Sequence, residues 1–547
     1  MRFPYATLGR GLLAGLVAGL LLTTVQGIAR LWLGVAPPAE LLGDRIAPLL
    51  TIDQFFGLFG VFGGYNGLKQ AGILRGTGGQ LAVGVVIAVA VALVIRRSAR
   101  RGYRLLAILT VAFYAAAVAV LWPILGTNHT GFAPGTGRVV SLAAMAVGFG
   151  LFGVAVGVGL RVLGGVAGPA AVPEREMVTA GGGTPPASGG SAEPGGGDER
   201  GARDGSGAPA VGRRALLGGV GVGVVGVGLA ASTGALGTAL YDRSTFPYDG
   251  LRVTGPGITP ITPNDAFYTV TKNVVDPRVD AGRWSFGVGG AVRTPATYDL
   301  AALTRMPETT QETTLMCISN GVGDGLMSNA LWTGVPLADL LTAAGPVDDA
   351  VEVVLTAVDG YTDTFSIEKA LDPTTMLAYR MNGDELPQRH GFPVRLVVPG
   401  LYGEKNLKWI TRVDVVTYDA EGFYETQGWG PDFVIPTRST ITEPPPAQVS
   451  RGSVVGLRGT AFGGDRGVSR VEVSTDDGRT WTDATITYPG TRLSWALWGF
   501  DWRPATAGAS AVLVRATDGA GGSQIVTDRG IVPTGATGLH RVPVTVL

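Results

Sequence analysis

The chain has 547 residues and a mass of 56.2 kDa, which is too long for one ordinary hydrophobic core and predicts three or four folded units. Only 16% of the residues are charged and 46% are hydrophobic, with a mean hydropathy of +0.29, so a disordered protein is excluded and part of the chain is predicted to lie in lipid. Lys+Arg and Asp+Glu number 43 each, and this balance excludes a basic surface that would bind nucleic acid.

Residues 1–164 contain four apolar runs that are long enough to cross a bilayer, at about 11–29, 78–95, 105–125 and 139–160. Positive charge is concentrated in the short loop between the second and third runs. The residues that carry it are Arg96, Arg97, Arg100, Arg101 and Arg104. Because such loops stay cytoplasmic, we expect a multi-pass plasma-membrane protein with its N-terminus inside and everything after about residue 235 outside.

The segment 46–60 allows two interpretations, since it is apolar but contains Pro48 and Asp53. We favour a re-entrant or interfacial segment, because a further span would place a carboxylate in lipid and would reverse the orientation of all that follows. His129 falls in a loop rather than in a span, so we expect no membrane haem. The spans contain almost no charge, which gives little support to a transporter.

Residues 165–212 are dominated by Gly, Ala, Pro, Ser and charge, and predict a disordered cytoplasmic linker. Residues 213–236 begin with Arg213-Arg214 and continue as a Gly-rich apolar stretch at about 215–232. This segment reads equally well as a fifth span or as an internal twin-arginine export signal, a pathway that carries folded proteins loaded with a cofactor.

Two water-soluble units follow. Residues 245–437 alternate β-branched runs, such as 351–358 and 392–400, with short helical ones such as 336–345, which predicts a mixed α/β domain. Residues 438–547 show strand alternation around an Asp-Gly turn and predict an Ig-like β-sandwich. The fold class is therefore multidomain, with a membrane bundle, an α/β domain and a sandwich.

A single cysteine, Cys317, excludes an intramolecular disulfide and any Cys-rich metal cluster, and three histidines leave little material for a multi-histidine centre. A lone cysteine is usually an inert buried residue. This one follows a predicted strand and opens a Gly-rich loop, Ile318–Gly325, which favours a thiolate presented to a soft metal.

Several motifs carry a resemblance to a known family. They are TPNDAFYTVTKN at 262–273, W-x-F-x-V-x-G at 284–290, LMCISN at 315–320, SNALWTGVPLADLL at 328–341 and LAYRMNGDELPQRHGFPVRLVVPGLYGEKNLKWITRV at 377–413. Together they resemble the molybdopterin-dependent oxidoreductases of the sulfite oxidase family. The sandwich, with VEVSTDDGRTW and RATDGAG, is similar to the molybdenum-cofactor dimerisation domain of that family. The resemblance covers about 250–547.

The resemblance implies that Cys317 is the catalytic residue that binds molybdenum, and that the pterin dithiolene and oxo groups complete the coordination. Cations and polar groups would hold the anionic cofactor. The positions that match the family's cofactor contacts are His390, Arg395, Asn406, Lys408 and, nearer the start of the domain, Asn264, Tyr268 and Thr269. A homodimer through the sandwich is a further expectation.

The sequence departs from the family where sulfite is bound. Sulfite-oxidising members carry a pair of arginines shortly after the cysteine, whereas this chain reads Ile318 to Val322 without one. Their active-site tyrosine is matched only approximately by Tyr424. These departures weigh against sulfite as the substrate.

The sequence thus predicts a membrane-anchored, extracytoplasmic enzyme that transfers an oxygen atom to or from a small molecule, in an undetermined direction, and passes electrons to a separate carrier. The alternative is a non-enzymatic envelope protein with a degenerate enzyme fold and an Ig-like contact domain. Cofactor content distinguishes the two.

Overall fold

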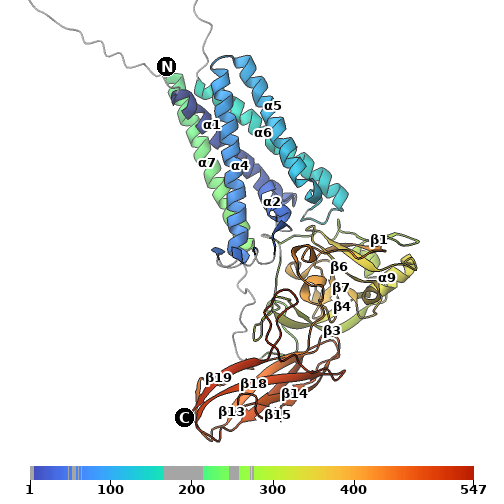
Figure 1. Ribbon diagram of the computed structural model, residues 1–547. Coiled ribbons are helices and arrows are strands. Elements are labelled where there is room, and N and C mark those ends of the chain that lie inside the picture. Colours follow the sequence, from blue (N-terminus) through green and yellow to red (C-terminus); the bar gives the residue numbers. More distant parts are fainter. Residues whose placement is uncertain are drawn as a thin grey trace, which may run out of the picture.

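The computed structural model describes residues 5–46, 49–51, 54, 57–58, 61–62, 65–127, 129–164, 213–244, 258–271, 273 and 276–547. A helical bundle, a mixed α/β domain and a C-terminal β domain follow one another in space (Figure 1). The predicted linker at 165–212 lies outside the described residues, as does much of the segment 46–60. The disorder of the former and the re-entrant path of the latter therefore stay predictions.

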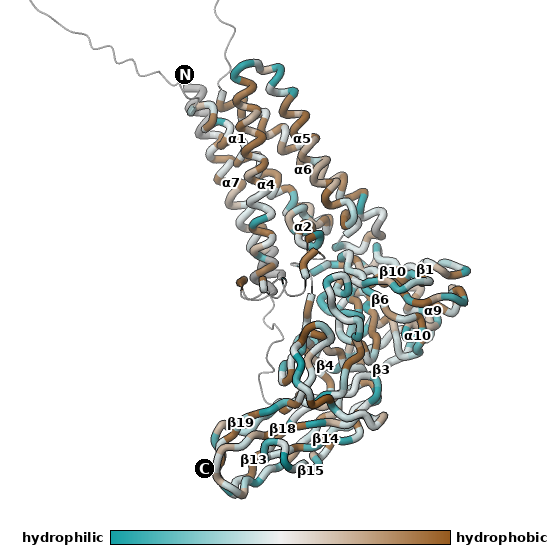
Figure 2. The backbone as a smooth tube through the Cα atoms, in the orientation of Figure 1, coloured by the Kyte–Doolittle hydropathy of each residue, from teal (hydrophilic) through white to brown (hydrophobic). Residues whose placement is uncertain are grey.

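Five described helices are long and apolar enough to cross a membrane. They are α1 (Tyr5–Trp32), α4 (Tyr65–Ile95), α5 (Ala99–Leu121), α6 (Pro134–Gly164) and α7 (Arg213–Ser244). Each predicted apolar run coincides with one of them, the third being continued by the 3-10 turn η2 (Trp122–Ile124), and the short helix α2 (Pro38–Ile46) follows α1. Hydrophobic residues dominate all five long helices (Figure 2).

The bundle packs through small residues. At Gly11 and Gly15 of α1, an added Cβ would lie 2.7 Å from the Cα atoms of Val89 and Val85 of α4. This distance is shorter than any ordinary Cβ contact, so the two backbones approach as closely as glycine allows. Lipid provides no hydrophobic force between helices, and such close packing is a main source of their association.

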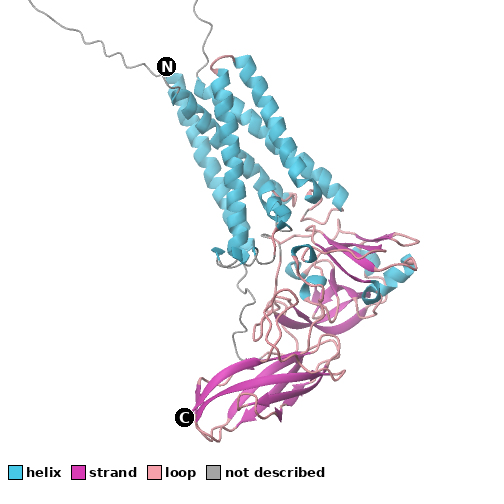
Figure 3. Ribbon diagram, in the orientation of Figure 1, coloured by secondary structure: helices cyan, strands magenta, loops and turns pink. Residues whose placement is uncertain are grey.

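The α/β domain contains two sheets (Figure 3). The first has the strand order β2 (Ala296–Tyr298), β1 (Phe286–Gly290), β10 (Ile410–Val416), β5 (Glu352–Ala357) and β6 (Thr362–Ser366). The second has the order β3 (Thr309–Met316), β4 (Met327–Pro336), β7 (Met376–Met381) and β8 (Asp384–Glu385), with β9 (Arg395–Val397) paired to β7. Among the described strands of these two sheets, only β1 and β10 pair in parallel.

Short helical segments connect these strands. They are α8 (Leu300–Leu303), α9 (Leu337–Ala344), α10 (Ile367–Ala370), η3 (Gln388–His390), η4 (Gly403–Lys405) and η5 (Glu425–Gln427). Helix α9 buries Leu337, Leu340 and Leu341 in the largest core of the domain. The predicted strand at 351–358 and the predicted helix at 336–345 are confirmed as β5 and α9. The run at 392–400 forms only the three-residue strand β9, because Pro393 cannot donate to a ladder.

The C-terminal domain consists of two sheets that share one core. The first has the order β11 (Arg438–Glu443), β13 (Val455–Phe462), β17 (Ala496–Trp502) and β16 (Thr485–Tyr488). The second has the order β12 (Gln448–Val449), β19 (His540–Val546), β18 (Gly508–Asp518), β14 (Val468–Ser474) and β15 (Thr482–Asp483). Leu457 and Trp498 of the first sheet meet Val471 and Val512 of the second, as expected for packed sheets.

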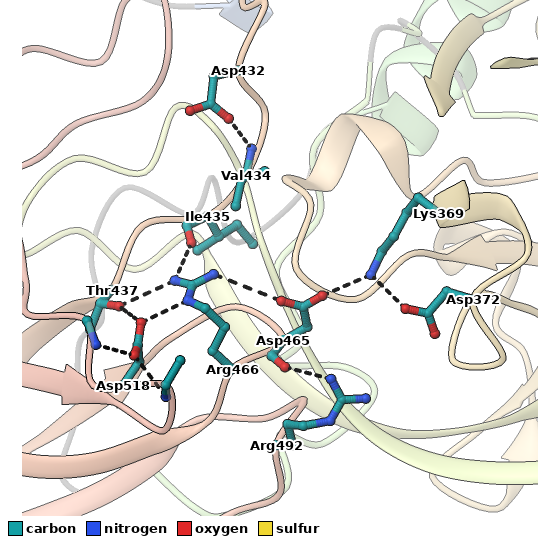
Figure 4. Close-up of polar contacts among 12 residues, drawn as sticks. Lys369, Asp372, Asp432, Val434, Ile435, Thr437, Asp465, Arg466, Arg492 and Asp518 are labelled. Carbon is teal, nitrogen blue, oxygen red and sulfur yellow. Dashed lines mark hydrogen bonds and ion pairs between the residues drawn. The ribbon is translucent and has the colours of Figure 1, made fainter. Parts of the chain in front are cut away.

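Polar contacts join the α/β domain to the C-terminal domain (Figure 4). Lys369 at the end of α10 donates to Asp465 at 2.9 Å and to Asp372 at 3.3 Å. On the far side of Asp465, Arg466 donates to Asp518 at 2.8 Å and to the carbonyl of Ile435 at 3.0 Å. The chain of contacts fixes the two domains at the segment that connects them.

The bundle contacts the α/β domain through the connection between η2 and α6. The amides of Arg278 and Asp280 donate to the carbonyls of His129 and Thr130 at 2.9 and 3.0 Å. The Arg283 guanidinium lies over the Phe132 ring, 5.4 Å from its centroid. The α/β domain therefore rests on one end of the bundle, opposite the α4–α5 connection (Figure 1).

Candidate active site

Cys317 begins the loop that joins β3 to β4, directly after the last strand pair, Met316 with Met327. Its amide donates to the Leu326 carbonyl and its carbonyl accepts from the Asn320 amide, both at 3.0 Å. The side chain of Asn320 also accepts from the Leu326 amide at 2.8 Å. The predicted position of the cysteine at a strand end is confirmed, and a hydrogen-bonded loop holds the thiol in place.

Arg438, at the start of the C-terminal domain, holds this loop in place through hydrogen bonds. The Arg438 guanidinium donates to the carbonyls of Asn320 and Gly321 at 3.2 and 2.7 Å, and to the Met316 sulfur at 3.3 Å. Sequence reasoning missed Arg438, although it stands in the conspicuous stretch PTRSTITEPPP. Its partners are main-chain carbonyls far away in sequence, which no local pattern reveals.

The thiol of Cys317 is only 8% exposed. Burial, and then the nearby Glu404 carboxyl, raise the pKa of the Cys317 thiol to about 12. A thiol in such surroundings carries its proton at neutral pH unless a cation replaces it. The site therefore favours a metal-bound thiolate over a free nucleophile.

The two cations predicted to bind the cofactor, Arg395 and Lys408, both donate to carbonyls of η3. Arg395 donates to the carbonyls of His390 and Asn406, both at 3.1 Å, and lies 4.8 Å from the centroid of the Trp332 ring. Lys408 donates to the Arg389 carbonyl at 3.3 Å. Burial lowers the pKa of Arg395 to about 10 and that of Lys408 to about 8. Because their carbonyl partners are neutral, the positive charges of Arg395 and Lys408 are not cancelled and can bind an anionic ligand.

His390 lies in the same group and is uncharged. Burial lowers the pKa of its imidazole to about 3, and the neighbouring cations Arg395, Lys408 and Arg389 act in the same direction. Its Nε2 lies 2.8 Å from the Asn264 carbonyl oxygen, so the neutral ring donates there and keeps Nδ1 as an acceptor.

The remaining predicted contacts divide in two. Tyr268 is buried near Cys317 and Arg395, which both influence its pKa, although burial is the main cause of the upward shift; Thr269 follows it directly. The side chains of Asn264 and Asn406 serve the fold instead. Asn264 accepts from Asn382 at 2.8 Å, and Asn406 accepts from the Val398 amide at 2.6 Å. The carbonyls of these two residues accept from His390 and Arg395, respectively.

Sequence reasoning also missed a buried ionic cluster beside η4. Lys405 is 1% exposed and donates to Asp363 at 2.6 Å and to Glu425 at 2.9 Å, with its ammonium 3.9 Å from the centroid of the Phe433 ring. Burial lowers the pKa of Lys405, but the two carboxylates outweigh burial and raise it. The preceding residue, Glu404, keeps both carboxyl oxygens buried.

The donor set can be tested against a molybdenum–pterin cofactor. Within the described residues, no group of three or more His, Cys, Asp or Glu side chains could hold a metal. One thiol with buried cations beside it fits a metal whose other ligands belong to an anionic cofactor. The Nε of Arg438 is buried without a hydrogen-bond partner, which also fits a site shaped for a polar group.

Comparison with known proteins gives matches over the same part of the chain. Residues 273–424 match the oxidoreductase molybdopterin-binding domain, and residues 432–530 match the Mo-co oxidoreductase dimerisation domain. Sulfite oxidase of Gallus gallus is 32% identical over 44% of this chain and 62% of its own length, and mitochondrial sulfite oxidase of Mus musculus is 31% identical over 44% and 52%. The chain thus spans about half the length of most of the curated relatives it matches.

A solved structure is also similar. The sulfane dehydrogenase SoxCD from Paracoccus pantotrophus is 26% identical, with a TM-score of 0.49 over 53% of this chain and 82% of its own. The first family model covers the loop of Cys317, and the second covers the strands of the C-terminal domain up to residue 530. Residues 273–530 of the chain therefore belong to the molybdopterin oxidoreductases of the sulfite oxidase family, a family of enzymes.

Proposed function

We propose that the protein is a membrane-anchored, extracytoplasmic molybdopterin oxidoreductase that transfers an oxygen atom to or from a small molecule. The observation that carries the proposal is Cys317, a buried thiol fixed at a strand end, with Arg395 and His390 buried and Lys408 half-buried close by. When bound, the cofactor supplies the molybdenum and the two-electron chemistry of oxygen transfer.

The residues of the chain have separate roles in this proposal. Cys317 would bind the metal through its sulfur and tune its potential. Arg395 and Lys408 would neutralise the pterin's phosphate, and His390 would accept a hydrogen bond at Nδ1. The carbonyls of Asn264 and Asn406 hold His390 and Arg395 in position, and Tyr268 and Thr269 would line the cofactor site.

The arrangement of the bundle supports the proposed topology. The N-terminus and the arginine-rich α4–α5 connection lie at one end of the bundle, and the α/β domain lies at the other (Figure 1). If the α4–α5 connection is cytoplasmic, as its arginines favour, the α/β domain would lie outside the cell. Arg213 and Arg214 begin α7, where they serve either as positive residues flanking a fifth span or as a twin-arginine signal.

The partners follow from the same proposal. Electrons pass to a separate carrier, since the proposal places no haem in the chain. The C-terminal domain, as an Ig-like sandwich of the dimerisation type, would pair two copies. Sulfite is disfavoured as the substrate, because the loop after Cys317 carries no arginine in residues 318–322 and Tyr424 replaces the usual tyrosine only in part.

Metal analysis by mass spectrometry, together with pterin fluorescence, tests the proposal on the full-length protein purified in detergent from a host that makes the cofactor. We expect about one molybdenum per chain, and we expect Cys317→Ser to abolish turnover while near-ultraviolet circular dichroism stays that of the wild type. Ser453→Ala, a substitution in the C-terminal domain, is the control. A folded wild type without molybdenum would favour the non-enzymatic envelope protein.

A further inference from the structure

Residues 278–280, which we call the docking segment, contact the membrane bundle at three consecutive positions. The amides of the first and last residues donate to the carbonyls of His129 and Thr130 at 2.9 and 3.0 Å. The next residue of the η2–α6 connection, Gly131, has a φ of +98°, and a Cβ added there would lie 2.9 Å from Cγ1 of Val279. The docking segment therefore approaches the bundle as closely as a glycine allows.

The middle residue of the docking segment, Val279, is bound to the side chain of Gln388. Its amide donates to Oε1 of Gln388 at 3.1 Å, and its carbonyl accepts from Nε2 of Gln388 at 3.2 Å. The carboxamide thus pairs with both main-chain groups of one residue, as donor and as acceptor. Because Val279 is only 4% exposed, loss of this pair would leave its main-chain groups without a partner at a cost.

Gln388 is the first residue of η3, and the other two residues of η3 hold the predicted cations of the cofactor site. The Arg389 carbonyl accepts from Lys408 at 3.3 Å, and the His390 carbonyl accepts from Arg395 at 3.1 Å. The imidazole of His390 is itself a predicted cofactor contact. A displacement of η3 would therefore move both cations and the imidazole together.

The docked bundle is thus two steps away from the predicted cofactor contacts. The first step is the contact of the bundle with the docking segment, and the second is the pair between Val279 and Gln388. Outer residues that orient the ligands of a metal site commonly contribute about tenfold or more to its affinity. Gln388 stands in the same relation to His390 and the two cations, because a site is precise only when the residues around it are held.

We propose that Gln388 is a positioning residue, through which the docked membrane bundle holds η3 in place and so retains the molybdenum–pterin cofactor. This inference rests on the proposed function and gives the bundle a role besides anchoring. A substitution in the η2–α6 connection, which includes no predicted cofactor contact, should then loosen the cofactor.

The test measures the rate at which molybdenum and pterin leave the full-length protein in detergent, after it has been purified with its cofactor. Gln388→Met removes both hydrogen bonds and keeps a side chain of similar length, and Gly131→Ala presses on Val279 from the bundle side. We expect both variants to release the cofactor about tenfold faster than the wild type. Gly135→Ala, in the first turn of α6, meets nothing within 4 Å and should release it at the wild-type rate.

A further variant separates positioning from a general loss of stability. Thr375→Val removes the buried hydrogen bond that Thr375 donates to the Lys369 carbonyl at 2.7 Å, in the same domain but outside η3. Its release rate should stay at that of the wild type. Hydrogen exchange of the amides at 388–391 should become faster in Gln388→Met and Gly131→Ala and stay unchanged in Thr375→Val.

Wild-type release from either Gln388→Met or Gly131→Ala, in a protein with the near-ultraviolet circular dichroism of the wild type, would overturn the proposal. Equally fast release from Thr375→Val would overturn it too. If Gly131→Ala does not fold, Gln388→Met and Thr375→Val decide. A wild type without molybdenum would instead overturn the proposed function, and this inference with it. Failure of this inference alone would leave molybdenum in the wild type and make its release independent of the docking segment.

Discussion

The bundle and the α/β domain bury charge in different places. In the bundle, the buried ionic cluster of Arg30, Glu40 and His129 lies at the end that faces the α/β domain. In the α/β domain, a second ionic cluster is formed by Lys405, Asp363 and Glu425. Lys405 directly follows Glu404, whose carboxyl group is near Cys317. Elsewhere the described helices pack mainly through glycine and apolar side chains, with neutral polar pairs such as Gln26 and Gln80. The ionic clusters of these two regions therefore lie at the docking end of the bundle and beside the candidate site.

The largest expected effect on stability follows from removing Lys405, the cation of the ionic cluster in the α/β domain, which we call the inner cluster. Lys405→Met leaves Asp363 and Glu425 buried without their partner, and we expect a loss of about 3–5 kcal/mol in the free energy of unfolding of the α/β domain. Urea titration followed by tryptophan fluorescence measures it. Lys369→Met, at a lysine whose side chain is 16% exposed, is the control and should cost about 1 kcal/mol or less. Equal losses in the two variants would contradict a special role for the inner cluster.

The ionic cluster of the bundle, which we call the outer cluster, consists of Arg30, Glu40 and His129. We expect it to contribute less to stability than the inner cluster and more to the contact between the bundle and the α/β domain. Arg30 donates to both oxygens of Glu40 at 3.0 and 3.3 Å, and Nε2 of His129 lies 3.6 Å from the same carboxylate. Glu40→Gln removes the negative charge and keeps the shape, at a cost of about 1.5–3 kcal/mol. Because His129 accepts from Arg278 through its carbonyl, we expect faster hydrogen exchange in 276–284. Unchanged hydrogen exchange in 276–284 would show that the outer cluster does not support the contact between His129 and Arg278.

Glycine packing in the bundle offers a test of the opposite kind, since no charge is involved. Gly15→Ala places a Cβ 2.7 Å from the Val85 Cα and forces α1 away from α4, at a cost of about 1–3 kcal/mol. Gly9→Ala, on the same helix, meets nothing within 4 Å and should be neutral or slightly stabilising. Thermal unfolding in detergent compares the two variants. A midpoint that rises equally in both would point to helix propensity rather than to packing.

The elements that the sequence predicted well are those that depend on local pattern. The helices around the apolar runs, strand β5, helix α9 and the strand end at Cys317 all follow from periodicity or composition. The ionic clusters could not be predicted, because Lys405 meets Asp363 across 42 residues and Arg30 meets His129 across 99. Asn264 and Asn406 show what motif matching leaves out: their role as cofactor contacts stays a prediction, whereas the hydrogen bonds that their carbonyls accept from His390 and Arg395 follow only from the fold.

The smallest expected effect lies in the C-terminal domain, where the buried Asp518 pairs with Arg466, whose side chain is 27% exposed. Burial raises the pKa of Asp518, but hydrogen bonds from Arg466 and Thr437 outweigh burial and leave it below its usual value (Figure 4). A carboxyl group whose pKa is lower in the folded state stabilises the fold above its unfolded pKa of about 3.9, and this stability is lost as the pH falls through the folded value. We therefore expect the unfolding midpoint to fall between pH 5 and pH 3, by the equivalent of about 1 kcal/mol. Asp518→Asn should lower the midpoint at pH 7 and reduce its dependence on pH in this range, and a variant with the full wild-type dependence would assign the acid sensitivity to other carboxylates.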